Sequence, residues 1–287
     1  QALALPELPA SLSIAGDDYI ALELATLFAR LGVRVKLSSP NAHLLAGADP
    51  AALRLVQAGM RKLGIAMSMN VTVKDIQERP LVVSPGMLHG IAPRIAGLHL
   101  DAASIQHSLD GGIQVDSQQR TSQPHIFAVG DCTGNLPKLA SYAIKQGKVA
   151  AEVIAGQRVQ FAPLVTPLVV HTTPEIALVG ASVEEAASMG TEIVSGRFPL
   201  AANGRAQTLG AENGVAQIIA SPDGTLLGAT LVGPRAGDLV GQLALAIEMG
   251  ATLTDVSEIL YVHPGLSETV LEAAEHALGK AVHIVGK

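Results

Sequence analysis

The sequence predicts an α/β protein in two parts: a doubly wound domain of the kind that binds nucleotides, and a C-terminal α+β domain. First, strand-like and helix-like segments alternate from residue 12 to residue 71. Second, short alternating strands replace this rhythm after Pro163 and Pro167. Third, 48% of the residues are hydrophobic and only 2% are aromatic, so Ala, Val, Leu and Ile must fill the core.

The N-terminal half supplies the elements of the doubly wound domain. A strand at 12–14 leads into Gly16, and we expect a helix over 20–31 because its apolar residues recur on one stripe. Gly32 follows this helix in the position of a C-terminal capping glycine. The same patterns then give a strand at 33–37, a helix at 50–63 and strands at 65–71 and 81–83.

The elements of the second half follow an irregular stretch at 84–118. A buried strand is expected at 126–129, ending in Gly130-Asp131, and an alanine-rich helix at 139–155. SPDG at 221–224 is a hairpin-turn signal. The α+β part is expected to hold strands at 177–179, 192–198, 215–220 and 226–232, and helices at 238–249 and 267–278.

Charge and hydropathy exclude two classes of partner. The net charge is −6 and no run of basic residues occurs, whereas nucleic-acid binding needs clustered Lys and Arg. No apolar run reaches the roughly 18 residues that a membrane-spanning helix needs. We therefore expect neither a nucleic-acid nor a membrane partner.

Cysteine usage bounds the redox chemistry. Cys132 is the single cysteine, so these 287 residues can form no internal disulfide and no multi-cysteine metal site, and we expect no metal. Scarce cysteine favours a reducing compartment, the cytoplasm. The sequence begins with Gln rather than Met, and we expect it to be processed, trimmed or cut from a longer chain.

The stretch GDDYIALE, which begins at Gly16, has the layout of a dinucleotide-binding loop between a strand and a helix. Such loops read G-x-G-x-x-G, and the three positions here hold Gly16, Asp18 and Ala21. Alanine is tolerated at the third position. Asp18 places a side chain and a negative charge where the pyrophosphate must lie, and with Asp17 it partly neutralises the helix dipole.

The second strand also lacks the acidic residue that would hold the ribose hydroxyls. Ser38 and Ser39 stand at that place. The simpler interpretation is a helix start capped by Asp17 or Asp18. On these residues alone, the capped helix is favoured over a working dinucleotide loop.

A second motif is TSQPHIFAVGDC, residues 121–132. Asp131 follows Gly130 at the end of the expected strand, where a carboxylate can accept hydrogen bonds from a ribityl or ribose hydroxyl. The helix start at Leu139 and Ala140 can turn free N–H groups toward a phosphate or a flavin oxygen. The alternative is an ordinary Gly-Asp turn, because many strands end in one.

A third motif is VHPGLSE, residues 262–268. His263 and Glu268 are five residues apart, across a proline and a helix start, and can form a histidine–carboxylate pair. In such a pair the carboxylate orients the ring and raises its basicity, and the ring moves protons. The alternative is a surface loop in which Ser267 caps the last helix.

Taken in order, these motifs resemble those of the pyridine nucleotide-disulphide oxidoreductases. The resemblance runs from GDDYIALE through TSQPHIFAVGDC and TTPEIALVG to FPLAANGRA, HPGLSE and the terminal AVHI. The last three look most like the dihydrolipoamide dehydrogenase branch. The resemblance covers essentially the whole chain, and its most specific part is the last 170 residues or so.

The resemblance implies a domain order and cofactors. Residues 1–118 would form a degenerate NAD-binding, Rossmann-like domain, 119–162 the returning part of an FAD-binding domain, and 163–287 the interface domain of a homodimer. Asp131 would contact the ribityl chain of FAD. The family's first dinucleotide loop and its C-x4-C pair would lie upstream. Components of a 2-oxo acid dehydrogenase complex would be possible partners.

The resemblance also implies roles for single residues. His263 would be the acid/base acting on the partner subunit's dithiol, and Glu268 would orient it. Glu23 holds the glutamate position of the family's YIALE motif. Against this, the loop has lost its central glycine, VKDIQERPLVVSPG omits a hairpin, and PGMLHGIAPRI scrambles a family motif. NAD binding is therefore expected to be weak or lost.

Two functional hypotheses remain open. In the first, the chain is the C-terminal portion of a dihydrolipoamide dehydrogenase-like flavoenzyme that oxidises a dithiol through a cysteine pair and FAD to NAD, and is inactive in isolation. In the second, it is a degenerate, non-catalytic paralogue that serves as a dimeric binding or scaffold subunit. A free-standing nicotinamide-binding domain is disfavoured, because the FAD segment would then have no use.

Overall fold

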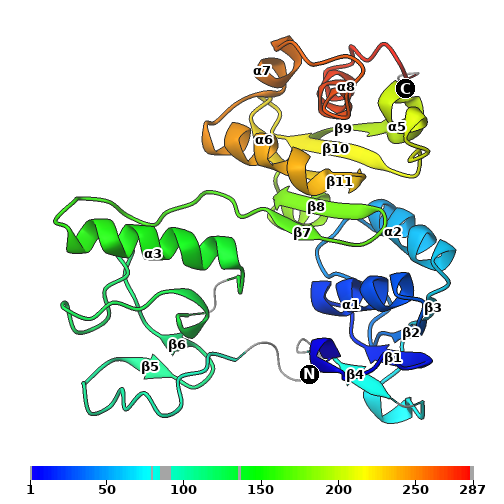
Figure 1. Ribbon diagram of the computed structural model, residues 1–287. Coiled ribbons are helices and arrows are strands. Elements are labelled where there is room, and N and C mark those ends of the chain that lie inside the picture. Colours follow the sequence, from blue (N-terminus) through cyan, green and yellow to red (C-terminus); the bar gives the residue numbers. More distant parts are fainter. Residues whose placement is uncertain (1, 79, 85–91, 135–136, 285–287) are drawn as a thin grey trace. The chain divides into compact units, whose positions relative to one another are not determined.

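The computed structural model describes residues 2–78, 80–84, 92–134 and 137–284, and it has the predicted α/β architecture (Figure 1). It divides into two compact units, Gln1–Leu88 with Leu164–Lys287, and His89–Pro163. The first unit holds a parallel sheet and a five-stranded antiparallel sheet, which confirms the predicted fold class. The predicted three-domain division stays a prediction.

The parallel sheet has the strand order β3-β2-β1-β4, the arrangement of one half of a dinucleotide-binding fold. Its helices are the crossovers between neighbouring strands: α1 (Tyr19–Arg30) joins β1 to β2, and α2 (Pro50–Lys62) joins β2 to β3. The strands are β1 (Ser11–Ala15), β2 (Arg34–Ser38), β3 (Ala66–Ser68) and β4 (Leu81–Val83).

The return from β3 to β4 is a loop. Over residues 69–78 and 80 it contains the 3-10 turn η2 (Val73–Asp75), and the described part forms no hairpin there. Most of the PGMLHGIAPRI stretch, residues 85–91, lies outside the described residues.

One hydrophobic core joins the parallel sheet to the C-terminal sheet. Ile14, Leu37 and Val56 belong to the same buried cluster as Ile176 and Val232. Gly59 of α2 allows this close packing, because a Cβ there would lie 2.1 Å from the Thr173 carbonyl oxygen. The two sheets of this unit are therefore packed as one body.

The antiparallel sheet has the order β7-β8-β11-β10-β9. The hairpin between β10 and β11 turns at residues 221–225, where Gly224 has φ +92°, so the predicted SPDG turn is confirmed. The strands are β7 (Leu168–Val170), β8 (Glu175–Gly180), β9 (Val194–Pro199), β10 (Val215–Ala220) and β11 (Leu226–Gly233).

Three helices cover one face of this sheet (Figure 1). Helix α6 (Ala236–Glu248) packs on β8 and β11, and α8 (Glu268–Ala277) packs on β9 and β10. Helix α7 (Leu253–Glu258) lies against α8. The short helices α4 (Val183–Ser188) and α5 (Gly204–Thr208) are located in the connections that follow β8 and β9.

The second unit contains α3 (Ala140–Ile154), the 3-10 turn η4 (Gly130–Cys132) and the two-residue strands β5 (His107–Ser108) and β6 (Gly112–Ile113). The predicted strand at 126–129 is wrong. Phe127 makes a single bridge to Arg120, and Ile126 is held in a turn by its N–H bond to the Gln123 carbonyl. A strand needs a partner along its length, and the described residues supply one at a single position.

No described helix combines the length and the apolar character required to cross a membrane.

Candidate functional site

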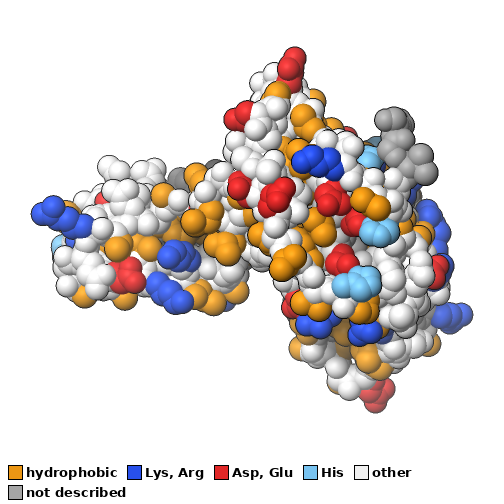
Figure 2. Space-filling model, turned by 90° about the horizontal axis from the view of Figure 1, so that it is seen from above, with side chains coloured by type: hydrophobic (Ala, Val, Ile, Leu, Met, Phe, Trp, Pro, Cys, Tyr) orange, Lys and Arg blue, Asp and Glu red, His pale blue; other side chains and the backbone are white. Residues whose placement is uncertain are grey.

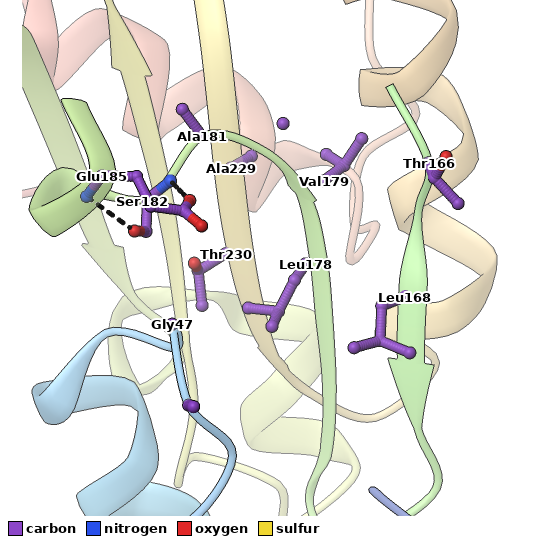
Figure 3. A pocket seen from close by; sticks show the side chains of 12 residues that line it. Gly47, Thr166, Leu168, Leu178, Val179, Ala181, Ser182, Glu185, Ala229 and Thr230 are labelled. Atoms are coloured by element: carbon purple, nitrogen blue, oxygen red, sulfur yellow. Dashed lines mark hydrogen bonds between the residues drawn. The ribbon is translucent and has the colours of Figure 1, made fainter. Parts of the chain in front are cut away.

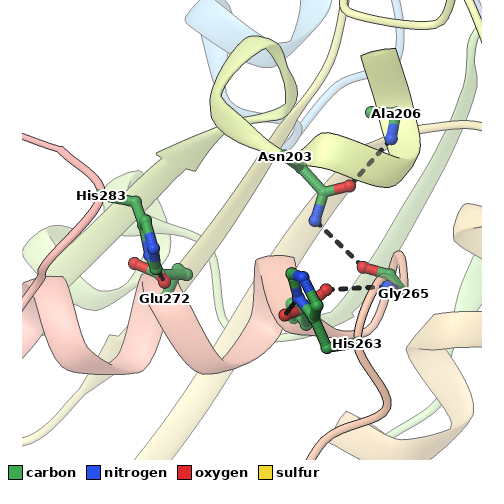
Figure 4. A network of polar contacts seen from close by, with 7 residues as sticks. Asn203, Ala206, His263, Gly265, Glu272 and His283 are labelled. Carbon is green, nitrogen blue, oxygen red and sulfur yellow. Dashed lines mark hydrogen bonds and ion pairs between the residues drawn. The ribbon is translucent and has the colours of Figure 1, made fainter. Parts of the chain in front are cut away.

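His263 and Glu268 form the histidine–carboxylate pair that their spacing predicts. His263 Nδ1 lies 2.7 Å from Glu268 Oε1 (Figure 4). Glu268 is the first residue of α8, and His263 precedes it in the connection from α7. The His263 side chain is 81% exposed and that of Glu268 only 21%. The pair thus offers an exposed ring on a partly buried carboxylate.

The electrostatics of the pair define its tautomer. Burial would raise the pKa of Glu268, but hydrogen bonds from the Gly265 N–H and from His263 outweigh it, so this pKa lies below its ordinary value of 4.5. Glu268 is therefore ionised near neutral pH and only accepts hydrogen bonds. The proton between the two groups belongs to His263 Nδ1, which leaves Nε2 free to exchange a proton with a substrate.

The loop that carries His263 is anchored from another element. Gly265 N donates to Glu268 Oε2 at 2.7 Å, and Asn203 Nδ2 donates to the Gly265 carbonyl at 3.0 Å. Asn203 is 4% exposed, and its Oδ1 caps α5 by accepting from Ala206 N. Asn203 stands in the FPLAANGRA motif, yet its sequence position gave no sign of this anchoring role.

The capping by Ser267, which belonged to the alternative interpretation, is not formed. Ser267 occupies the N-cap position of α8, but its side chain makes no capping hydrogen bond. The first turn of α8 uses the Glu268 carboxylate for the His263 loop instead. The surface-loop interpretation therefore does not describe this helix start.

A second histidine–carboxylate pair follows along α8, and the sequence did not predict it. His283 Nδ1 is bonded to Glu272 Oε1. The Glu272 side chain is 8% exposed, and that of His283 is 65% exposed. His283 lies in the terminal AVHI, which was recognised as a motif without a role.

The candidate dinucleotide loop is closed by its own aspartates. Asp18 caps α1, with Oδ1 accepting from Ala21 N at 2.9 Å and Oδ2 bonded to the Ser84 hydroxyl. A Cβ at Gly16 would lie 2.5 Å from Ser84 Cβ and 2.8 Å from Ala21 Cβ, so this glycine is needed for close packing. The structure thus brings Gly16 and Ala21 together with Asp18, whose own carboxylate caps the helix.

Asp17 uses the neighbouring polar groups in the same way. Its Oδ2 accepts from Asn41 Nδ2 at 2.5 Å and lies 3.5 Å from Ser39 Oγ, and its carbonyl accepts from Leu45 N. Ser39, at the position expected to hold a ribose-binding acid, is fully buried. These groups therefore pair with one another at the end of β2.

Glu23 serves a contact within the first unit. Its Oε1 accepts from the His171 backbone N–H at 3.0 Å, which joins α1 to the end of β7. The carboxylate thus links α1 to the residue that follows β7.

The residues expected to contact FAD lie in the second unit. Asp131 is exposed in η4, and its carboxylate accepts no hydrogen bond from the described residues. The N-cap of α3 is Leu139, which has no side chain that can cap, so in the described part of the chain no side chain caps the first turn from Ala140 onward. Gly130 has φ +76° and its N–H donates to the buried Gln146.

A lysine holds the loop before α3. Lys138 Nζ donates to three carbonyls, those of Asp131, Thr133 and Gly134, at 2.8, 3.2 and 3.1 Å. Its ammonium therefore fixes the backbone on which Asp131 stands. An exposed carboxylate beside an uncapped helix start fits the ribityl hydroxyls and phosphate of a flavin dinucleotide.

A pocket of about 180 Å³ lies near β7, β8 and the start of α4 (Figure 3). Its charged residue, Glu185, is committed to a capping box with Ser182. In the part of the chain that the structure describes, no group of three or more His, Cys, Asp or Glu could hold a metal ion. The pocket therefore offers neither a free charge nor a metal site.

A parallel sheet of dinucleotide-binding strand order beside an antiparallel domain places the chain in the class of α/β proteins with a Rossmann-like domain. Residues 1–147 match the family model "Pyridine nucleotide-disulphide oxidoreductase", and residues 166–274 match the dimerisation domain of the same family. The chain belongs to the pyridine nucleotide-disulphide oxidoreductase family.

Its relatives include dihydrolipoyl dehydrogenases. That of Halobacterium salinarum is 39% identical over 305 residues, covering all of this chain and 64% of the relative. That of Geobacillus stearothermophilus is 35% identical over 303 residues, with the same coverage. The chain thus spans about two thirds, 64%, of the length of these relatives.

Solved structures agree in fold. LpdA from Mycobacterium tuberculosis superposes with a TM-score of 0.84 at 28% identity, over 94% of this chain and 62% of that one. The flavoprotein disulfide reductase RclA from Escherichia coli gives 0.85 at 23% identity, over 95% of this chain and 66% of that one, which shows the fold alone.

Proposed function

We propose that the chain forms part of a dihydrolipoamide dehydrogenase-like flavoprotein, in which His263 is the acid/base and Glu268 orients it. The observation that carries this proposal is the 2.7 Å contact between His263 Nδ1 and Glu268 Oε1, with an exposed ring and an ionised carboxylate. His263 Nε2 takes a proton from a thiol of the partner subunit's dithiol and returns it in the reverse reaction.

Asp131 and the start of α3 are proposed to hold FAD. The exposed Asp131 carboxylate would accept from ribityl hydroxyls, and the N–H groups after Leu139 would face a phosphate or flavin oxygen. When bound, FAD supplies two-electron transfer between the dithiol and a nicotinamide. Lys138 supports this role by fixing the carbonyl of Asp131.

The residues at Gly16 do not fit NAD. The Asp18 carboxylate already occupies the α1 N-terminus, where a pyrophosphate would have to bind, and its charge repels one. We therefore propose that NAD binding at this loop is weak or lost, and we assign Glu23 a structural contact there.

A homodimer is the proposed assembly, with each His263 acting at the partner subunit's dithiol. Several large apolar side chains lie exposed on the helical face of the C-terminal domain, between acidic side chains (Figure 2). Patches of this kind mark protein interfaces. They are Leu245, Met249, Ile259, Leu260 and Val262.

The single cysteine limits the redox chemistry that the isolated polypeptide can perform. With Cys132 alone, a polypeptide of these 287 residues cannot form the disulfide that dithiol oxidation requires, so we propose that by itself it has no dehydrogenase activity. Components of a 2-oxo acid dehydrogenase complex are the proposed partners, and the cytoplasm is the proposed location because cysteine is scarce.

The alternative is a non-catalytic dimeric scaffold subunit. The closed loop around Asp18 favours this alternative, because a subunit without NAD binding cannot complete the reaction. The exposed His263 and its support from Asn203 favour catalysis instead, because a scaffold has no need of them.

Activity assays on the protein purified from its source cell distinguish the flavoenzyme from the scaffold subunit. We expect dihydrolipoamide to reduce the bound flavin, and the rate of this reduction to fall about 100-fold or more in His263→Gln. His171→Gln, at an exposed histidine outside the pair, is the control. An active wild-type protein that keeps its rate in His263→Gln would overturn the acid/base role. A dimeric wild-type protein with no activity would support the scaffold.

A further inference from the structure

Glu272 carries a buried carboxylate that, among the described residues, has His283 as its hydrogen-bond partner. Glu272 is 6% exposed on α8, and its Oε1 is bonded to His283 Nδ1. Its Oε2 is buried and accepts no hydrogen bond from residues 2–78, 80–84, 92–134 and 137–284. Burying a carboxylate is costly unless it is paired, so the free energy of burial here depends on the C-terminal segment that carries His283.

This contact lies beside the proposed acid/base pair. Glu268 and Glu272 are four residues apart on α8, so their side chains are neighbours on one face of the helix, about 5–6 Å apart at Cβ. Each accepts from a histidine that comes from outside the helix, His263 before it and His283 after it (Figure 4). The two pairs therefore stand in tandem along α8.

The charges around His283 favour its protonated form. The hydrogen bond and charge of Glu272 raise the pKa of His283 above 6.5, and Glu268 and Glu275 act in the same direction. Burial and the charge of Glu272 raise the pKa of Glu275, and the charge of Lys280 opposes this rise. His276 is turned elsewhere, since its Nδ1 accepts from Arg197 N of β9. A protonated His283 in turn lowers the pKa of Glu268.

We propose that Glu272 and His283 are positioning residues for the acid/base pair, in which Glu272 holds the C-terminal segment 280–284 on α8 and His283 places a positive charge beside Glu268. This charge adds to the hydrogen bonds from Gly265 and His263 that favour the ionised Glu268 carboxylate. The ionised carboxylate accepts from His263 Nδ1 and leaves Nε2 for the substrate. The catalytic part of this assignment rests on the proposed function. The contacts of Glu272 and His283 are independent of it.

Glu272→Gln tests the first half of the assignment by NMR on the 287-residue chain. Glutamine keeps the shape of the side chain and removes its charge, so the titration midpoint of His283 should fall toward the ordinary value of about 6.5. The amides of 281–284 should exchange faster. Glu275→Gln is the matched control, because it removes a carboxylate from the same helix without touching the His283 hydrogen bond, and it should lower the His283 midpoint less than Glu272→Gln does. An unchanged His283 midpoint in Glu272→Gln would overturn the assignment.

His283→Gln tests the second half. Glutamine can still donate to Glu272 but carries no charge, so the carboxyl titration of Glu268, followed by its side-chain ¹³C shift, should move to higher pH. A merely structural His283 would leave this titration in place, and that result would contradict the positioning role.

These titrations need neither a flavin nor turnover. If the chain is not part of a disulfide oxidoreductase, the midpoints still shift as described while His263→Gln leaves activity unaffected. If the tandem arrangement is wrong, the midpoints stay and the His263 dependence of activity can persist. The two failures are thus distinguishable.

Discussion

At the scale of single residues, Asp18 determines what the loop after β1 can bind. Its carboxylate accepts from Ala21 N and is bonded to Ser84, so the N-terminus of α1 is already satisfied. Asp18→Gly should bind NADH more tightly, because it frees these N–H groups and removes a repelling charge. Isothermal titration of both proteins measures this. Unchanged or weaker affinity would place the defect elsewhere, with Ser39 and Asn41 the next residues to test.

Glu268 should make the free energy of unfolding depend on pH, which is again an effect of a single residue. Its folded-state pKa lies below 4.5, so its interactions contribute stability above pH 4.5 and lose it as the pH falls through the folded-state value. Glu268→Gln should therefore flatten the acid side of the unfolding free energy between about pH 3 and pH 5. Urea unfolding across this range measures it, with Glu258→Gln as an exposed control. If the unfolding free energy of Glu268→Gln fell with decreasing pH as steeply as that of the wild type, Glu268 would not be the source of this pH dependence.

At the scale of elements, α2 shows how backbone packing joins the two sheets. Gly59→Ala places a Cβ 2.1 Å from the Thr173 carbonyl oxygen, so we expect destabilisation of about 1–3 kcal/mol despite alanine's better helix propensity. Gly241→Ala in α6 is the matched control, since nothing lies within 4 Å of its Cβ position. There the helix preference alone should stabilise by about 0.5–1 kcal/mol. Chemical unfolding measures both, and equal effects of the two substitutions would contradict the packing role of Gly59.

The same scale shows which parts of the fold the sequence can predict. Helix α1 was predictable because its apolar stripe and Gly32 are local signals. Strand β7 and helices α4, α5 and α7 were not, because elements of three to six residues carry too little periodicity. The strand predicted at 126–129 was wrong, because apolar residues alone do not supply a pairing partner.

The candidate site divides in the same way. The spacing of His263 and Glu268 predicts their contact, since five residues across a helix start bring the side chains together. The Asn203 anchor and the Glu272–His283 pair were missed. Asn203 reaches Gly265 from 62 residues away, and Glu272 looks like any polar residue of an amphipathic helix until its burial is seen. Contacts that depend on tertiary packing leave no local signal.

At the scale of the whole molecule, the exposed apolar face over α6 and residues 259–262 predicts self-association. Leu260 is fully exposed. Leu260→Asp should shift the chain from dimer to monomer in sedimentation velocity, because a charge in an interface core costs several kcal/mol to bury. Leu109→Asp, at a leucine 79% exposed between β5 and β6, is the control and should leave the dimer intact. A dimer that survives Leu260→Asp would exclude this face.

The whole chain combines a histidine–carboxylate pair with a loop after β1 whose helix start is capped by Asp18, and our proposal that it does not bind a nicotinamide dinucleotide rests on the second of these. Calorimetric titration of the 287-residue chain with NADH tests this most directly. We expect no saturable binding up to millimolar NADH, because Asp18 occupies the phosphate position. Saturable binding at micromolar NADH would contradict the closed loop and restore the chain as a functional nicotinamide-binding subunit.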